Sequence, residues 1–169
     1  MIYTFIPYAL NKDNFGNSCN DYFKLLGDDD WGAYLTYDQM FLTPHWLQQL
    51  YTAIENNPEV GMFTCYTNRI GSAFQKIGAD ENNHSVRYHR EFAEKIRKDK
   101  GDAVKILPPE PPISGHFVLL KKSIWQEVGG FSNGFLSVDN DMHRKVVRKG
   151  YKVGLIEGLY VYHWYRAYD

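Results

Sequence analysis

The sequence lacks several features that would place it in a class at once. It has only 2 cysteines, Cys19 and Cys65, with no metal-type spacing and no secretory leader before them. They fit reduced thiols of a cytoplasmic protein better than a disulfide. No apolar run approaches the roughly 20 residues that span a bilayer, so no transmembrane segment is expected. The formal net charge of -1 also argues against a nucleic-acid partner, which usually needs a basic face.

Common catalytic and nucleotide-binding motifs are missing as well. The chain contains no P-loop, no G-x-G-x-x-G, no H-E-x-x-H and no G-x-S-x-G. Its composition is otherwise that of a globular domain, with 44% hydrophobic and 23% charged residues in a chain of 169. Aromatic residues are plentiful at 16%, and such rings build cores as well as platforms for nucleobases and sugars.

Apolar periodicity predicts alternating strands and helices. Strand-like runs cover residues 2–8, 31–38, 60–67, 115–122 and, as two short closing strands, 151–164. Helical runs cover residues 17–26, 44–57, 122–131 and 140–149. The first strand is expected to be buried, and residues 84–102 are expected to form a mobile or surface helix. Together these predict one α/β domain over residues 1–169 with a mainly parallel sheet, and a mobile insertion or lid over residues 71–112.

Four polar residues are candidates for chemistry, and each has a structural alternative. Asp38 follows an apolar strand, where ligands gather, and suits either a divalent cation with a diphosphate or a turn. His163 ends the last apolar strand and suits either a metal ligand or a packed imidazole. Asp139 precedes a helix, where it suits either a general base or a helix cap. Asp141, inside the first turn, fits the capping interpretation better.

The order and spacing of these pieces resemble glycosyltransferase family 2, whose members have the GT-A fold. The run from Ser114 to Trp164 contains a "GGF" turn, an acid pair, a helix closing at "GY" and a final "VYH". "AYLTYDQMFLTPHWLQQL" resembles the family's strand ending in a D-x-D motif, and "FIPYALNKD" resembles its nucleotide-facing first strand. The N-terminal half is short, since only 37 residues precede Asp38. Thr36 stands at the first D-x-D acid, and Val138 stands where the E-D motif commonly has glutamate.

The resemblance implies a GT-A-like sandwich that transfers a sugar from a UDP- or GDP-type nucleotide-diphosphate-sugar to a saccharide or other hydroxyl acceptor, with inversion. It implies that Asp38 and His163 bind Mn²⁺ or Mg²⁺, and that Asp139 is the catalytic base. The implied donor-side residues are Pro7, Tyr8, Asn11 and Asp38, and the implied acceptor-side residues are His116, Trp164 and Tyr165.

Other interpretations stay open at this point. A non-catalytic nucleotide-sugar-binding module would explain Thr36 and the short N-terminal half. A nucleotidyltransferase would use similar metal chemistry, but it normally needs a Gly-rich basic phosphate loop. If the chain were a pure interaction protein, the positions of Asp38, Asp139 and His163 would be coincidental. On the expected lid, Arg87, His89 and Arg90 fit either phosphate contacts or a solvated charged face.

Overall fold

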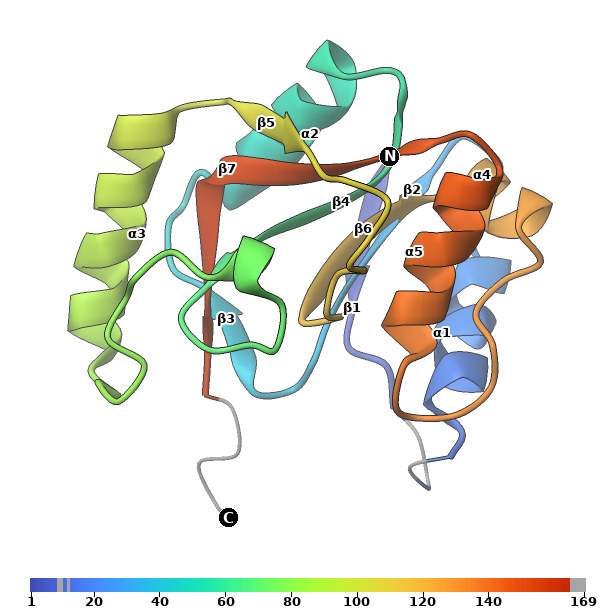
Figure 1. The fold of residues 1–169 in the computed structure, drawn as a ribbon, viewed down its shortest axis with the longest axis horizontal. Helices are drawn as coiled ribbons and strands as arrows, with labels where there is room; N and C mark the ends of the chain where they lie inside the picture. Colours follow the sequence, from blue (N-terminus) through green and yellow to red (C-terminus); the bar gives the residue numbers. More distant parts are fainter. Residues whose placement is uncertain (9–10, 12, 165–169) are drawn as a thin grey trace.

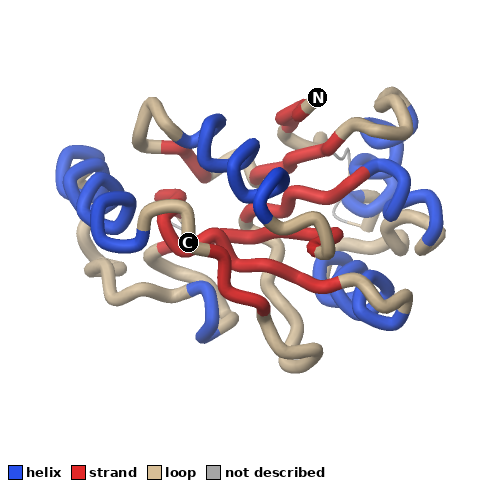
Figure 2. Tube along the Cα trace, turned by 90° about the horizontal axis from the view of Figure 1, so that it is seen from above, coloured by secondary structure: helices blue, strands red, loops and turns tan. Residues whose placement is uncertain are grey.

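The computed structural model, which describes residues 1–8, 11 and 13–164, is a sandwich with helices on both sides of a central sheet (Figures 1 and 2). Its strands are β1 (Ile2–Phe5), β2 (Trp31–Leu35), β3 (Gln39–Phe41), β4 (Val60–Thr67), β5 (Val104–Ile106), β6 (Phe117–Lys121) and β7 (Lys152–His163). Its helices are α1 (Phe15–Lys24), α2 (Trp46–Asn56), the 3-10 turn η1 (Ala73–Gln75), α3 (Val86–Lys100), α4 (Lys122–Glu127) and α5 (Val138–Arg148). The strand order is β1-β2-β6-β4-β7-β3, and β5 pairs with β7 beside this path.

Strand direction decides which residues meet at each edge of the sheet. β1 pairs in parallel with β2, and β4 pairs in parallel with β7. β6 lies antiparallel between β2 and β4, and β3 and β5 are antiparallel to β7. Strands β1, β2, β4 and β7 therefore run in one direction. Their carboxyl ends together form one border of the sheet, here called the carboxyl edge. The expected α/β class and GT-A-like fold are confirmed, with the antiparallel strands β3, β5 and β6 making the sheet mixed.

Alternating strand residues supply two apolar layers, because successive side chains point to opposite faces of a sheet. On one face, Tyr34 and Val118 belong to a layer that includes side chains of α1, α3, α4 and α5. On the other face, Ala33 and Leu119 pack in a layer with Leu50 of α2. Because both faces are covered, β4 is buried along its whole length, and its sequence VGMFTCYT has no alternating polar face.

The last strand corrects the expectation of two short closing strands. β7 is a single strand of 12 residues that bends sharply in the middle (Figure 1). The bend lies at residues 157–159, between the pairs Cys65↔Ile156 and Tyr66↔Tyr160. It lets the first half of β7 pair with β5 and the second half with β3. The sequence pattern predicts neither short partner, because three residues carry too little periodicity.

The first strand is an edge strand, which corrects the expectation that it is buried. β1 pairs with β2, and Tyr3 and Ile6 are 44% and 53% exposed. An apolar run of this length has the same pattern at the edge of a sheet as at its centre. Its position follows from topology, since α1 leads directly from β1 to β2 and no described strand lies beyond β1.

Gly158, in the bend of β7, allows the end of α3 to approach the strand closely. A Cβ at this residue would overlap the carbonyl oxygen of Gly101, at the end of α3, and crowd Gln49, which donates to the Gly158 carbonyl. We expect Gly158→Ala to lower the free energy of unfolding by about 1–3 kcal/mol, as overpacking does. Gly71→Ala is the control, because its Cβ would meet only Ser114 Oγ, at 3.5 Å. Urea denaturation with equal losses in both variants would contradict this explanation.

Candidate active site

Asp38 lies in the turn between β2 and β3, and its carboxylate is held from two sides. Thr36 Oγ1 donates to Asp38 Oδ1 at 2.7 Å, and His163 Nε2 lies 3.2 Å from Asp38 Oδ2. The backbone N–H of Trp164 donates to the Asp38 carbonyl at 2.9 Å, which ties the end of β7 to this turn. Burial alone would raise the pKa of Asp38, but the contacts with His163 and Thr36 outweigh it and lower the pKa. Asp38 is therefore an anion at neutral pH.

His163 has a ring whose orientation is fixed by the backbone around it. Its Nδ1 lies 2.9 Å from the carbonyl oxygen of Arg69, which can only accept, so Nδ1 carries the hydrogen. The main chain of His163 makes two hydrogen bonds with the Asn68 side chain, at 2.8 and 3.0 Å. Nε2 therefore faces the Asp38 carboxylate.

The Asp38–His163 pair has the chemistry and spacing of two neighbouring metal ligands. Two ligands about 2.1 Å from an octahedral ion, in adjacent positions, lie about 3.0 Å apart. The separation of Oδ2 and Nε2 is 3.2 Å. A histidine ligand also usually donates its other N–H to an acceptor such as a backbone carbonyl, as His163 does. No group of three His, Cys, Asp or Glu side chains suited to a metal exists in the described part of the chain, so water and phosphate oxygens would complete the coordination.

Asp139 belongs to the first turn of α5 and contacts the stretch that leads into β6 at the same edge of the sheet. The backbone N–H of Gly115 donates to Asp139 Oδ2. Residue 115 has to be glycine, because a Cβ there would lie 2.5 Å from Asp139 Cβ and 2.7 Å from the Tyr34 hydroxyl. Burial raises the pKa of Asp139, although hydrogen bonds from the backbone N–H groups of Asp139, Gly115 and Asn140 act against it. A raised pKa makes the carboxylate a stronger base.

Asp141, two residues further along α5, has different partners. Ser132 Oγ donates to Asp141 Oδ2 at 2.5 Å, and Lys145 Nζ lies 2.9 Å from the same oxygen. Lys145 also donates to the carbonyl of Gly130, so these side chains hold the "GGF" turn against α5. Burial would raise the pKa of Asp141, but the contacts with Ser132 and Lys145 lower it. The two neighbouring acids therefore have opposite electrostatic environments.

His116 lies directly before β6, beneath His163. Its Nδ1 accepts from Gln75 Nε2 at 3.1 Å, and its Nε2 lies 3.6 Å from Cys65 Sγ. The ring is 1% exposed and stacks on the His163 ring with centroids 6.4 Å apart. Burial and the nearby His163 lower the pKa of His116 to about 3. His116 is therefore a neutral ring that packs against His163. Because it is buried, it presents no exposed ring to an acceptor.

The other predicted binding residues lie on loops at the same edge. Pro7 and Tyr8 follow β1 after Ile6, and Asn11 comes further along the same loop. Trp164 follows the end of β7 and is 40% exposed, while Tyr8 is 73% exposed. Tyr165 lies outside the described residues. The roles of these two rings stay predictions.

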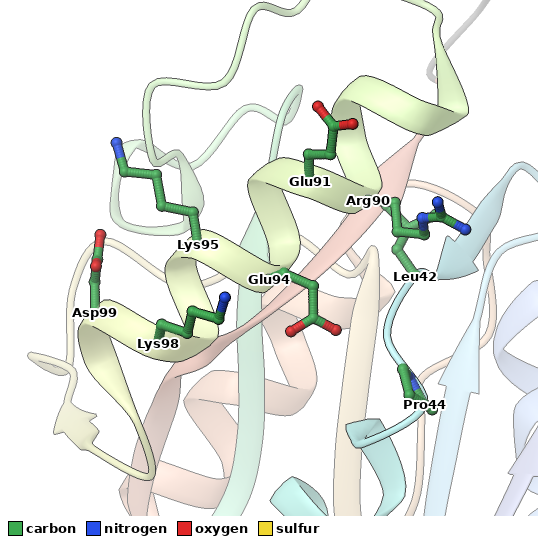
Figure 3. Close-up of a pocket in the computed structure, with 8 residues that line it drawn as sticks. All are labelled: Leu42, Pro44, Arg90, Glu91, Glu94, Lys95, Lys98 and Asp99. Carbon is green, nitrogen blue, oxygen red and sulfur yellow. The ribbon is translucent and has the colours of Figure 1, made fainter.

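A separate groove lies between α3 and the turn after β3 (Figure 3). Its volume is about 690 Å³. It is lined by Leu42, Pro44, Arg90, Glu91, Glu94, Lys95, Lys98 and Asp99. Its three cationic and three acidic side chains balance one another, so it has no net charge with which to attract a phosphate.

The expected lid contains a helix that packs against the sheet. The buried side chains of α3 are His89, Ala93 and Ile96. His89 Nδ1 lies 2.7 Å from the Tyr160 hydroxyl and its Nε2 lies 2.5 Å from a backbone carbonyl, so its ring is not free for a phosphate. Arg87 pairs with Glu91 at 3.0 Å. The charged-face interpretation therefore has the better support here, and movement of residues 71–112 stays a prediction.

Three contributors to the site are not predicted by the sequence. They are the backbone N–H of Gly115, the carbonyl of Arg69 and the side chain of Asn68. The two backbone groups leave no signal in the sequence. The "TNR" at the end of the apolar run of β4 is a signal of the same kind as the one that identified Asp38, namely polar residues at a carboxyl strand end.

The fold and these side chains define a GT-A-like protein with a candidate metal-and-base site at the carboxyl edge of its sheet. The family described as "Glycosyl transferase family group 2" matches residues 37–165, a span that includes Asp38, Asp139 and His163. The chain belongs to this glycosyltransferase family, which gives its general activity as glycosyl transfer. No curated protein matches it. Within the described residues, no helix is both long and apolar enough to cross a membrane.

The two acids of α5 should respond to pH with opposite signs. The raised folded-state pKa of Asp139 means that stability falls as pH rises above the ordinary value of about 3.9. Asp139→Asn should therefore be at least as stable as the wild type at neutral pH. Any difference in the free energy of unfolding should disappear in acid, where Asp139 is protonated in both the folded and the unfolded state. Asp141 has a lowered pKa, so its contribution is present above about 3.9 and is lost as pH falls.

Asp141→Asn should consequently lose stability at neutral pH, by less than about 1 kcal/mol because the pair with Lys145 is partly exposed. Urea denaturation of both variants between acid and neutral pH measures these differences. The assignment of opposite pKa shifts is wrong if Asp139→Asn is less stable than Asp141→Asn at neutral pH and remains less stable in acid.

Proposed function

We propose that this chain is a metal-dependent, inverting glycosyltransferase of the hexosyl type. It would transfer a sugar from a UDP- or GDP-type nucleotide-diphosphate-sugar to the hydroxyl of a saccharide or another acceptor. The observation that carries the proposal is the 3.2 Å approach of Asp38 Oδ2 and His163 Nε2 at the sheet edge where Asp139 also lies. Membership of the family supports the class of reaction.

Asp38 and His163 are the residues proposed to hold Mn²⁺ or Mg²⁺. The bound ion supplies positive charge that neutralises the leaving diphosphate. Thr36 would orient the carboxylate by donating to Asp38 Oδ1. The Arg69 carbonyl would keep the hydrogen on His163 Nδ1 and so orient the ring with Nε2 toward Asp38 and the ion.

Asp139 is proposed to accept the proton of the acceptor hydroxyl. As the proton moves to the carboxylate, the acceptor oxygen bonds to the anomeric carbon and the bond from that carbon to the diphosphate oxygen breaks. Attack from the face opposite the diphosphate inverts the anomeric configuration. The proposal is supported by burial, which raises the pKa of Asp139, and by the Gly115 N–H, which orients its carboxylate.

The surrounding loops would hold the two substrates. Pro7, Tyr8 and Asn11 are proposed to contact the nucleotide, because the carboxyl end of β1 lies at the same edge as that of β2. Trp164 and Tyr165 are proposed to contact the acceptor, since aromatic faces suit sugar rings.

The remaining parts of the proposal concern organisation and location. Residues 1–169 would form one domain with residues 71–112 as its lid. Gln75, within this lid, bonds to Ser114 and His116 beside the site. The cytoplasm is the proposed location, because Cys19 and Cys65 are both buried free thiols.

A non-catalytic nucleotide-sugar-binding module is the second candidate. Thr36 favours it, because a D-x-D motif with one acid has less negative charge with which to hold a metal and its diphosphate. Such a module would bind the same ligands without releasing nucleoside diphosphate. Turnover therefore separates the two candidates.

Thermal-shift measurements with UDP- and GDP-sugars, with and without Mn²⁺, test the proposal, because a bound ligand raises apparent stability. We expect a metal-dependent shift in the wild type and a strongly reduced one in Asp38→Asn. Asp139→Asn should keep the shift but release nucleoside diphosphate about 10²–10⁴-fold more slowly. Asp141→Asn, the control, should keep both properties. A shift without turnover in the wild type would support the binding module, and equal shifts in chelator and in Mn²⁺ would exclude the metal role.

A further inference from the structure

The buried phenol of Tyr34 has no hydrogen-bond partner among the described residues. Tyr34 lies in β2 and is 0% exposed, and its hydroxyl oxygen is buried and unbonded. The hydroxyl of Tyr160, on the same face of the sheet, instead lies 2.7 Å from His89 Nδ1. An unsatisfied buried hydroxyl destabilises the folded state, because it has lost its hydrogen bonds to water. Such a group in a folded protein needs an explanation, and a functional role is one of the recognised ones.

The position of this hydroxyl is fixed, and it lies beside the proposed base. Rings of Phe5, Phe15 and Phe131 surround the Tyr34 ring, with centroids 5.9 to 6.4 Å away. A Cβ at Gly115 would lie 2.7 Å from the Tyr34 hydroxyl and 3.0 Å from Asp139 Cγ. Both distances are measured from the same point, so the phenol and the carboxyl group lie close together beside Gly115, which has no side chain.

The other titratable groups near this pair are occupied or neutral. They are Cys19 of α1, His116 next to Gly115, and Asp141 and His143 of α5. Burial raises the pKa of the Cys19 thiol and lowers that of His116, so both are uncharged at neutral pH. Asp141 is bonded to Ser132 and Lys145, and His143 Nε2 lies 3.1 Å from the carbonyl of Pro109. Burial, and then the charge of Asp139, raise the pKa of Tyr34, so the phenol keeps its hydrogen.

We propose that Tyr34 is a positioning residue for Asp139, its hydroxyl donating a hydrogen bond to the carboxylate in the ionised, working state of the site. This inference rests on the proposed role of Asp139 as the base. Hydrogen bonds of catalytic groups are often long or poorly aligned in free enzymes and tighten in the reacting complex. Gly115 permits the approach, because any side chain there would separate the two groups. The phenol would orient the carboxylate and oppose the rise in its pKa that burial causes.

Tyr34→Phe tests the proposal, with ¹³C NMR titration of the Asp139 carboxyl carbon as the readout. Loss of a donor to the ionised form should raise the titration midpoint of Asp139 by about one pH unit or more. The acid limb of the kcat/KM profile should move by the same amount, with little change in the KM for the donor. Tyr160→Phe, which removes a buried phenol bonded to α3, is the control and should leave the midpoint of Asp139 unchanged.

A second measurement needs no change at Tyr34. In protein labelled at tyrosine Cζ, the Tyr34 signal should shift at the pH where Asp139 ionises, and this shift should disappear in Asp139→Asn. A midpoint that is the same in Tyr34→Phe and wild type, or a Tyr34 signal indifferent to Asp139, overturns the proposal even if the enzyme is active. A coupled titration in a protein without turnover supports the Tyr34–Asp139 pair and contradicts only the proposed function.

Discussion

The common direction of β2, β4 and β7 is the constraint on which the candidate site depends. Asp38 follows β2, Asn68 and Arg69 follow β4, and His163 ends β7, so these residues meet at one edge although they are far apart in the chain. β6 begins at this edge because it runs the other way, and it brings Gly115 and His116 there.

Backbone contacts make this meeting rigid. The Trp164 N–H bonds to the Asp38 carbonyl, and the Asn68 side chain bonds to both main-chain groups of His163. The hydrogen bonds of the neighbouring strands thus hold Asp38 and His163 close together. Without them, the attraction within the pair would have to offset both the lost side-chain freedom and the lost hydration.

Burial and bonding partners together give the two acids of α5 different chemistry. Asp139 accepts hydrogen bonds from backbone N–H groups, with no cation bonded to it among the described residues, and burial raises its pKa. Asp141 meets Lys145 and Ser132, and its pKa is lowered. The first environment suits a proton acceptor and the second suits a structural anchor. The sequence alone leaves both acids as candidates for a helix cap, because the burial of Asp139 and the hydrogen bond from Ser132 to Asp141 depend on tertiary packing.

The long elements could be predicted from the sequence because their apolar patterns are strong. The run at residues 60–67 coincides with β4, and residues 84–102 contain α3. The edge position of β1, the single bent β7 and the short strands β3 and β5 could not be predicted, since each depends on tertiary pairing. In the site, Asp38 and His163 could be selected from their places after strands. The role inferred for Tyr34 could not, because in the sequence it is one more aromatic residue of an apolar strand.

The central claim is that a divalent ion and a diphosphate bind at Asp38 and His163. Paramagnetic broadening of backbone amide NMR signals by Mn²⁺ in the presence of UDP tests it most directly, with Mg²⁺ as the diamagnetic reference. The account predicts that broadening centres on the end of β7 and on the turns that follow β2 and β4. Broadening centred instead on the acidic side chains of α3, or broadening unaffected by UDP, would contradict it.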